Sequence, residues 1–250
     1  KFFPPYRGGM ESFLSDLVQT QRSQGIDSHA IVHGDPLPDD PHWLRRVPVQ
    51  LNLIYTPIAL GFRMALKRAI HQLHPQVLHL HLPNVSAFWA LTLINAYKVP
   101  WVVHWHSDVV VSEERLALRV AYTLYRPFEQ ALLERCERIV VTSLPYLYAS
   151  EPLQHWLPKC VVVPLAIHTQ LPDFEHGPTP WLPKRLRLLS LGRLAHYKGF
   201  DTLIRAVSAS HQLQLIIAGH GEDMASLQAL VRSSASDEDG AHVQLLGEVS

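Results

Sequence analysis

Along the first 164 residues, segments with the apolar spacing of a helix alternate with short apolar runs typical of strands. Apolar residues recur at helical spacing over 11–24, 59–73, 85–97 and 113–136, and Pro127 predicts a kink in the last of these. Short apolar runs typical of strands fall at 28–33, 47–54, 76–82, 101–105, 138–142 and 160–164. Because helical segments separate most of the strands, the pattern predicts parallel βαβ units.

A proline-rich stretch interrupts this pattern before it starts again. Residues 169–184 show no regular period and are therefore predicted to be a linker. Beyond it, strands are expected at 186–191, 213–218 and 243–246, with helices at 200–208 and 223–231. The sequence thus predicts an α/β protein, with one Rossmann-like domain over 1–168 and part of a second over 185–250. Both ends are expected to be cut, since the chain starts without Met in a loop and stops after an apparent strand.

Composition narrows the class of protein. Lys and Arg number 22, as do Asp and Glu, so no global attraction to nucleic acid is expected. Cys136 and Cys160 each lie within an apolar run, which favours a reducing cytosol over a disulfide-linked secreted domain. Since no signal peptide and no run of about 18 apolar residues appears, a cytoplasmic location is expected.

The local charge distribution is less even. From Pro41 to Ser107 the chain has no Asp or Glu. The cations in this stretch are Arg45, Arg46, Arg63, Lys67, Arg68 and Lys98, and aromatic residues lie between them at Trp43, Phe62, Phe88, Trp89 and Trp101. The pattern is compatible with a peripheral contact with the inner face of the cytoplasmic membrane, where a lipid-linked acceptor would lie. An ordinary solvated face, with some of the aromatic residues in the core, is the alternative, and the sequence favours it slightly.

In open parallel sheets, ligands bind beyond the carboxyl ends of the strands, so loops that follow strands are the candidate sites. Residues 192–199 form such a loop, in which Arg193 offers a planar fork of donors and Lys198 a compact cation. This pair suits a diphosphate leaving group, whose negative charge grows as it departs. Near the N-terminus, Gly8 and Gly9 precede a helix whose free N–H groups could receive an anion, although a flexible turn is an equally good interpretation.

A third glycine loop follows the predicted strand at 213–218. Gly219 and Gly221 would let the backbone approach a nucleotide closely. A dinucleotide fingerprint would need a further glycine where the chain has Met224, so that kind of site is excluded.

Four histidines fall in pairs on two predicted strands. His79 and His81 lie two apart on one strand, and His104 and His106 lie two apart on another, so each pair shares a face. Metal ligation is one interpretation. It is weakened because Asp108 is the only acidic residue nearby in the sequence. In the other interpretation His79 and His104 pack inside, while His81 and His106 reach a ligand at the strand ends.

In this order and spacing, the loops resemble those of the retaining glycosyltransferases of family 4, which have the two-domain GT-B fold. The segments that carry the resemblance are FPPYRGGME, VLHLHLPN, VVHWHSD, VVVPLAIH, LSLGRLAHYKGFDTLIRAV and LIIAGHGEDMASLQALV. GRLAHYKG with the downstream GHG is the most specific of them. The resemblance covers essentially the whole chain.

The resemblance implies a donor that is a nucleotide diphosphate sugar, linked to UDP or GDP. Arg193 and Lys198 would clamp its diphosphate, so that no metal and no further cofactor is needed. Gly8, Gly9, Gly219 and Gly221 would also contact the donor, His106 would sit beside the transferred sugar, and Arg7, His81 and Asn84 would contact the sugar or lipid-linked acceptor. Transfer would retain the anomeric configuration and serve glycan, polysaccharide or glycolipid synthesis.

Three departures from the family pattern are visible. The strand expected before FFPP and everything after Ser250 are absent from the sequence, including the paired-glutamate motif, so the polypeptide by itself is expected to be inactive. Residues 164–167 read Pro-Leu-Ala-Ile where the family often has Pro-Asn-Gly-Val. Two other functions stay open, namely an inactive binding or scaffold protein with the same fold and a histidine-ligated metal hydrolase.

Overall fold

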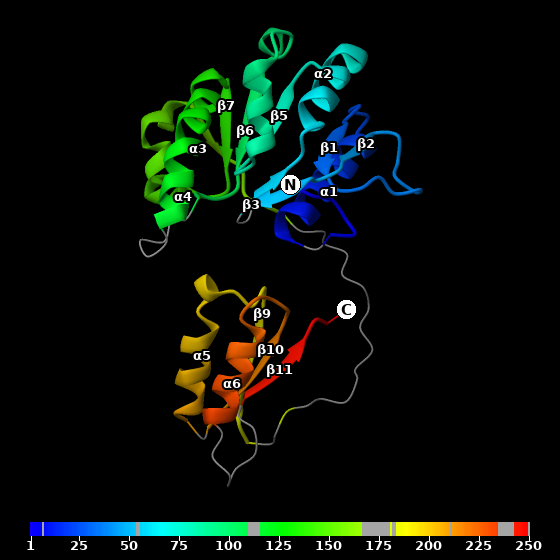
Figure 1. The fold of residues 1–250 in the computed structure, drawn as a ribbon. Helices are drawn as coiled ribbons and strands as arrows, with labels where there is room; N and C mark the ends of the chain where they lie inside the picture. Colours follow the sequence, from blue (N-terminus) through cyan, green and yellow to red (C-terminus); the bar gives the residue numbers. More distant parts are fainter. Residues whose placement is uncertain are drawn as a thin grey trace. The chain divides into compact units, whose positions relative to one another are not determined.

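The computed structural model describes residues 1–6, 8–53, 56–109, 116–166, 181, 184–210, 212–234 and 243–249. The chain divides into two compact units, Lys1–Thr169 and Gln170–Ser250, which we describe separately (Figure 1). In the described part of the chain, no helix has the length and apolar character needed to cross a lipid bilayer.

The first unit is built on parallel sheets. Its strands are β1 (Ala30–His33), β2 (Leu44–Val47), β3 (Leu51–Leu53), β4 (Thr56–Ile58), β5 (Leu78–Leu82), β6 (Trp101–Trp105), β7 (Arg138–Val141) and β8 (Cys160–Val162). Its helices are α1 (Gly9–Ser23), α2 (Phe62–Leu73), α3 (Leu116–Arg135) and α4 (Leu144–Ala149), with 3₁₀ segments η1 (Val85–Thr92), η2 (Ala96–Lys98) and η3 (Glu151–Lys159). Strands β5, β6, β7 and β8 form one parallel sheet in that order, β1 and β2 form a second, and β3 and β4 form an antiparallel hairpin.

Alternation along β5 places its two histidines on one face of the sheet. Leu78, Leu80 and Leu82 are buried in the main core, whereas His79 and His81 point to the opposite face. The carboxyl ends of β5 and β6 lie side by side, with His81 paired in register with His104. The sheet therefore brings together residues that are 23 to 27 positions apart in the chain.

The second unit is a smaller parallel sheet with helices packed against it (Figure 1). Its elements are β9 (Leu186–Leu191), η4 (His196–Lys198), α5 (Phe200–Ser208), β10 (Leu213–Ala218), α6 (Met224–Ser234) and β11 (Val243–Gly247). The strand order is β11-β10-β9, and all the pairs are parallel. Its core includes Leu194, Ile204, Val207 and Leu215, all at most 1% exposed. The sequence placed β9, α5 and β10 at their observed bounds.

Two of the predicted elements differ from the observed ones in kind or in number, whereas several others differ only by a few residues at their ends. The helix expected over 85–97 consists of the 3₁₀ segments η1 and η2. Small or apolar residues are buried at every third position here, at Ala87, Ala90, Leu93, Ala96 and Val99. A spacing of three matches the 3₁₀ repeat and not the 3.6 residues of an α-helix, which accounts for the error.

The strand expected over 47–54 was also wrong. Residues 44–47 form β2, residues 51–53 form β3, and Pro48 lies between them. Proline has no N–H to donate to a neighbouring strand, so it separates the two. The start of the helix predicted at 113 lies outside the described residues. Pro127 lies inside α3, and the kink predicted there stays a prediction.

Candidate functional site

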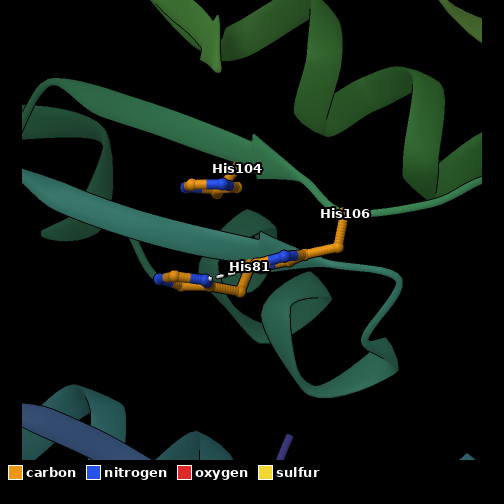
Figure 2. Close-up of side chains that lie close together, drawn as sticks. All are labelled: His81, His104 and His106. Atoms are coloured by element: carbon orange, nitrogen blue, oxygen red, sulfur yellow. Dashed lines mark hydrogen bonds between the residues drawn. The ribbon is translucent and has the colours of Figure 1, made fainter. Parts of the chain in front are cut away.

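A cluster of imidazole rings occupies the carboxyl ends of β5 and β6 (Figure 2). Nδ1 of His81 lies 2.9 Å from Nε2 of His106, so one ring donates a hydrogen bond and the other accepts it. His104 stacks on both, at centroid distances of 5.3 Å from His81 and 4.4 Å from His106. Phe13 of α1 packs its ring against His104 and His106. The sheet thus brings His81 and His106 together, and adds His104 to them.

Burial keeps these rings neutral. It lowers the pKa of His79 and of His106 to about 4, with the positive charge of the N-terminus and then His79 adding to the shift at His106. Burial together with His106 and His79 lowers the pKa of His104 to about 3, and the pKa of His81 also lies well below its ordinary value. Both ring nitrogens of His104 and Nε2 of His79 are buried without a hydrogen-bond partner among the described residues. At neutral pH the cluster therefore offers uncharged nitrogen lone pairs.

Asp108, two residues beyond His106, is the centre of a hydrogen-bond network that the sequence did not reveal. Its Oδ1 accepts hydrogen bonds from Trp105 Nε1 at 2.8 Å, from the Tyr146 hydroxyl at 2.8 Å and from the Ser150 hydroxyl at 2.7 Å. These bonds fix the loop that carries His106 to α4. Because its donors come from residues up to 42 positions away, no local motif could have identified this role.

Near the half-buried Asp108 lies a buried carboxyl group, that of Glu129 of α3, which is 1% exposed. Burial, followed by the charge of Asp108, raises the pKa of Glu129 to about 7. The Tyr122 hydroxyl approaches its Oε2 at 3.5 Å. A carboxyl group with this pKa exchanges its proton near neutral pH, and the sequence had given no sign of it.

The glycine loop at the N-terminus lies at the start of α1. Gly8 is the residue before the helix, and Gly9 is its first residue. A Cβ added at Gly8 would lie 2.3 Å from Glu11 Oε2, which shows that the Glu11 carboxylate folds back over Gly8. An anion at this helix start would therefore have to displace the Glu11 carboxylate. Arg7 lies outside the described residues, so its predicted acceptor contact stays a prediction.

Buried polar groups hold this opening segment in place. Arg46 forms an ion pair with Asp40 at 2.9 Å and donates hydrogen bonds to the carbonyl oxygens of Phe3 and Pro4. His33 bonds the Lys1 carbonyl oxygen through one nitrogen, at 2.9 Å. Since Arg46 is only 6% exposed, the expectation that it belongs to a lipid-facing basic surface was wrong. Its carboxylate partner lies just outside the acid-free stretch from which that expectation came.

Asn84, predicted to contact the acceptor, caps η1 in the structure. Its side-chain oxygen accepts a hydrogen bond from the N–H of Ser86 at 3.1 Å. Ser86 in turn bonds Nε2 of the buried His33 at 2.9 Å. The Asn84 side chain therefore has a structural role at the end of β5, which leaves its predicted contact with an acceptor untested.

In the second unit, the two candidate loops follow neighbouring parallel strands. Arg193, directly after β9, is exposed and donates to Glu222 Oε2 through Nε at 3.3 Å and Nη2 at 3.1 Å. The side chains of this pair are 61% and 44% exposed. Exposed ion pairs contribute at most about 1 kcal/mol, so an incoming anion can displace Glu222. Lys198, at the end of η4, is exposed and places its Nζ over the ring of Tyr197 at 5.4 Å.

Gly219 and Gly221 pack against the backbone of the Arg193 loop. A Cβ added at Gly219 would lie 1.9 Å from the carbonyl oxygen of Gly192, and one at Gly221 would lie 2.2 Å from that of Leu194. Gly219 also has φ +139, a conformation that favours glycine. Hydrogen bonds from Leu194 N–H to His220 O and from Asp223 N–H to Leu194 O join the two loops. These glycines therefore hold the Arg193 loop in position, whatever their contact with a ligand.

Parallel α/β units with polar loops beyond the strand ends define a protein of the Rossmann-like class. Residues 7–171 match the family model described as Glycosyltransferase Family 4, and residues 173–250 match the model described as Glycosyl transferases group 1. The chain belongs to glycosyltransferase family 4.

Two curated proteins are similar over nearly the whole chain. D-rhamnosyltransferase WbpZ of Pseudomonas aeruginosa is 26% identical over 97% of the chain and 62% of its own length. The O-antigen chain mannosyltransferase C of Escherichia coli is 25% identical over 98% of the chain and 65% of its own length. The chain thus spans somewhat less than two thirds of each of these relatives.

Solved structures show the fold. Anabaena Alr3699/HepE in complex with UDP-glucose has a TM-score of 0.62 and 16% identity, covering 99% of this chain and 68% of that chain. The apo form of the lipopolysaccharide outer core galactosyltransferase WaaB has a TM-score of 0.56 and 16% identity, covering 97% of this chain and 65% of that chain. The fold is therefore of the GT-B type, as the sequence predicted.

Proposed function

We propose that the chain forms the acceptor-side unit and the first part of the donor-side unit of a retaining glycosyltransferase. The donor is a nucleotide diphosphate sugar, linked to UDP or GDP, and the acceptor is a hydroxyl of a growing polysaccharide or glycolipid. Family membership supports transfer of a sugar, and a similar structure with UDP-glucose bound supports a nucleotide-linked donor.

The observation that carries the proposal is the loop after β9. It presents two exposed cations, Arg193 and Lys198, at the carboxyl end of a parallel sheet. The glycine loop after β10 fixes its backbone, and its one ion-pair partner described here, Glu222, is exposed. Such a loop can bind a diphosphate without a metal ion, because guanidinium and ammonium groups supply the positive charge.

In the proposed reaction, the acceptor oxygen forms a bond to the anomeric carbon as the bond from that carbon to the diphosphate oxygen breaks. Attack comes from the face that the diphosphate leaves, so the configuration is retained. The acceptor proton passes to the departing phosphate oxygen, and Arg193 and Lys198 stabilise the charge that grows on the diphosphate. His106 lies beside the sugar, with its ring oriented by the hydrogen bond to His81.

The two curated relatives suggest which sugar is transferred. One is named a D-rhamnosyltransferase and the other a mannosyltransferase. D-Rhamnose is 6-deoxy-D-mannose, so the two sugars share the same ring stereochemistry. We therefore propose a sugar of the manno series as donor, and an O-antigen-type polysaccharide as product.

An exposed surface on α2 and η1 supports contact of the acceptor-side unit with an anionic membrane. Leu60, just before α2, Met64 on α2 and Ile94, just after η1, are 70%, 45% and 82% exposed. Arg63 joins the two elements through a hydrogen bond from Nε to Thr92 Oγ1 at 3.0 Å, and Lys67 is exposed on α2. Apolar side chains beside cations match a lipid surface with anionic head groups. By contrast, Phe62 and Trp101 are buried in the core, which corrects part of the aromatic pattern inferred from the sequence.

Donor binding tests the proposed clamp. In a polypeptide that includes residues 1–250, Arg193→Ala with Lys198→Ala should weaken binding of UDP- or GDP-sugars by at least about 100-fold, since each charged hydrogen bond contributes roughly 1.5–3 kcal/mol. Glu222→Gln should strengthen binding, because it removes the carboxylate that competes for Arg193. Arg205→Ala, at an exposed position on α5, is the control. Equal affinities in all four proteins, measured by calorimetry, would reject the clamp.

A further inference from the structure

We propose that His81, His104 and His106 form a binding site for a divalent transition-metal ion of the Zn²⁺ class. From the sequence, metal ligation by these histidines was the weaker of two interpretations, and no metal site was predicted. The site proposed here lies in the first unit. It goes beyond the transferase function and does not depend on it.

The first observation is the convergence of ligand atoms. One nitrogen from each of the three rings lies within 4.8 Å of the other two, and this is the one such cluster found in the described part of the chain. His81 Nδ1 and His106 Nε2 are already 2.9 Å apart. Two nitrogens bound tetrahedrally to Zn²⁺, each at about 2.0–2.1 Å, lie roughly 3.3 Å apart, so this pair has to open by only a few tenths of an ångström.

The second observation is independent of the first, because it concerns unsatisfied groups. His104 is 3% exposed, and neither of its ring nitrogens has a hydrogen-bond partner among the described residues. A buried polar atom without a partner costs about 1–3 kcal/mol. A metal ion bound to His104 would remove part of this cost.

The chemistry of the cluster selects the kind of ion. The ligands are neutral imidazoles, which suit Zn²⁺, Co²⁺, Ni²⁺ and Cu²⁺ better than Mg²⁺ or Ca²⁺, which prefer oxygen. The nearest acidic residue along the chain, Asp108, accepts three side-chain hydrogen bonds at Oδ1 and is not among the residues whose ligand atoms converge here. His81 and His106 are only partly buried, so water can complete the coordination.

The rings have to turn to receive the ion. The planes of His81 and His104 are 7° apart, and those of His81 and His106 are 19° apart, so their lone pairs do not yet converge (Figure 2). The ring torsion of histidine is soft, which allows this movement.

The test uses the 250-residue chain stripped of metal with EDTA. Titration with Zn²⁺ against a chromophoric chelator should give one tight site, and Co²⁺ should give the intense visible bands of a tetrahedral complex without a thiolate charge-transfer band. His104→Val should lower the affinity by at least about 100-fold, more than is typical of losing an outer-shell partner. The double variant His71→Asn with His74→Asn is the control. It removes an exposed pair of histidines, one in the last turn of α2 and one directly after the helix, and should bind Zn²⁺ as the parent does.

Circular dichroism establishes that the variants fold. If His104→Val does not fold, His106→Asn, at a partly exposed position, takes its place with the same expected loss. If the parent shows no tight site for Zn²⁺, the proposal is overturned, and buried water would then be the partner of His104. Zn²⁺ binding that persists in the folded His104→Val or His106→Asn variant also overturns the proposal, because it would assign the ion to surface histidines.

Discussion

Single polar residues in the first unit are kept in unusual states by burial. Arg46 and Asp40 form a nearly buried ion pair, the histidines are held neutral, and Glu129 is held protonated up to about pH 7. Burial is the largest cause of each pKa shift, since a charged group loses more hydration than a neutral one. For this reason burial lowers the pKa of the histidines and raises that of Glu129.

The raised pKa of Glu129 predicts how the stability of the first unit depends on pH. Its ordinary pKa is 4.5 and its folded value is about 7, so between these values the folded state binds the proton that the unfolded state has lost. Raising the pH across this range therefore reduces stability, by up to about 1.4 kcal/mol per pH unit. Glu129→Gln should remove the loss, so the variant should gain on the parent in urea denaturation as the pH rises from 4.5 to 7.

The histidines have lowered pKa values, so their contribution to stability increases as the pH rises. Because parent and variant share them, this contribution cancels in the difference between the two free energies of unfolding. Glu134→Gln, at an exposed position on the same helix, is the matched control and should follow the parent. A constant difference in stability between Glu129→Gln and the parent at every pH would show that Glu129 ionises normally in the folded state.

At the scale of elements, the loops after β9 and β10 support each other through their backbones. Gly219→Ala should destabilise the second unit by on the order of 3 kcal/mol, because the new Cβ would meet the Gly192 carbonyl oxygen and the backbone has positive φ. Gly221→Ala should act in the same way against Leu194. Hydrogen exchange at β9 and β10 measures the effect.

Gly192→Ala is the control for these substitutions. The new Cβ would meet only the ring of Phe200, at 3.6 Å, so exchange at β9 and β10 should change little. Protection in Gly219→Ala equal to that in Gly192→Ala would mean that the two loops are not locked together as described.

Most elements could be predicted from apolar periodicity, since strands such as β6, β9 and β10 are short apolar runs with clear ends. The prediction was wrong for η1 and η2, where buried positions recur every three residues, and for residues 47–54, where Pro48 divides an apolar run into two strands. In the candidate site, His81 and His106 were predictable from their positions at strand ends. The roles of Asp108 and Glu222 depend on contacts across 29 to 42 residues, and that of Glu129 depends on burial, which no local pattern encodes.

At the scale of the whole molecule, the exposed surface of α2 and η1 predicts binding to anionic membranes. The chain should co-sediment with vesicles that contain phosphatidylglycerol and not with pure phosphatidylcholine. Lys67→Glu with Arg68→Glu should weaken this binding on the order of 30-fold, because each cation near the surface contributes about 1 kcal/mol. Arg205→Glu, in the other unit, should bind as the parent does. Sedimentation that is indifferent to the anionic lipid would dispose of this surface.

The proposed function depends most on Arg193 and Lys198, the two cations of the loop after β9 that would stabilise a departing diphosphate. The direct measurement is sugar transfer by a polypeptide that includes residues 1–250, supplied with GDP- and UDP-linked sugars of the manno and gluco series and an O-antigen-type acceptor. A manno donor should be turned over with retention of configuration. Replacing both Arg193 and Lys198 by alanine should reduce turnover by at least about 100-fold, whereas Arg205→Ala should keep near-parental turnover. Transfer by the double variant at the parental rate would contradict the proposed function.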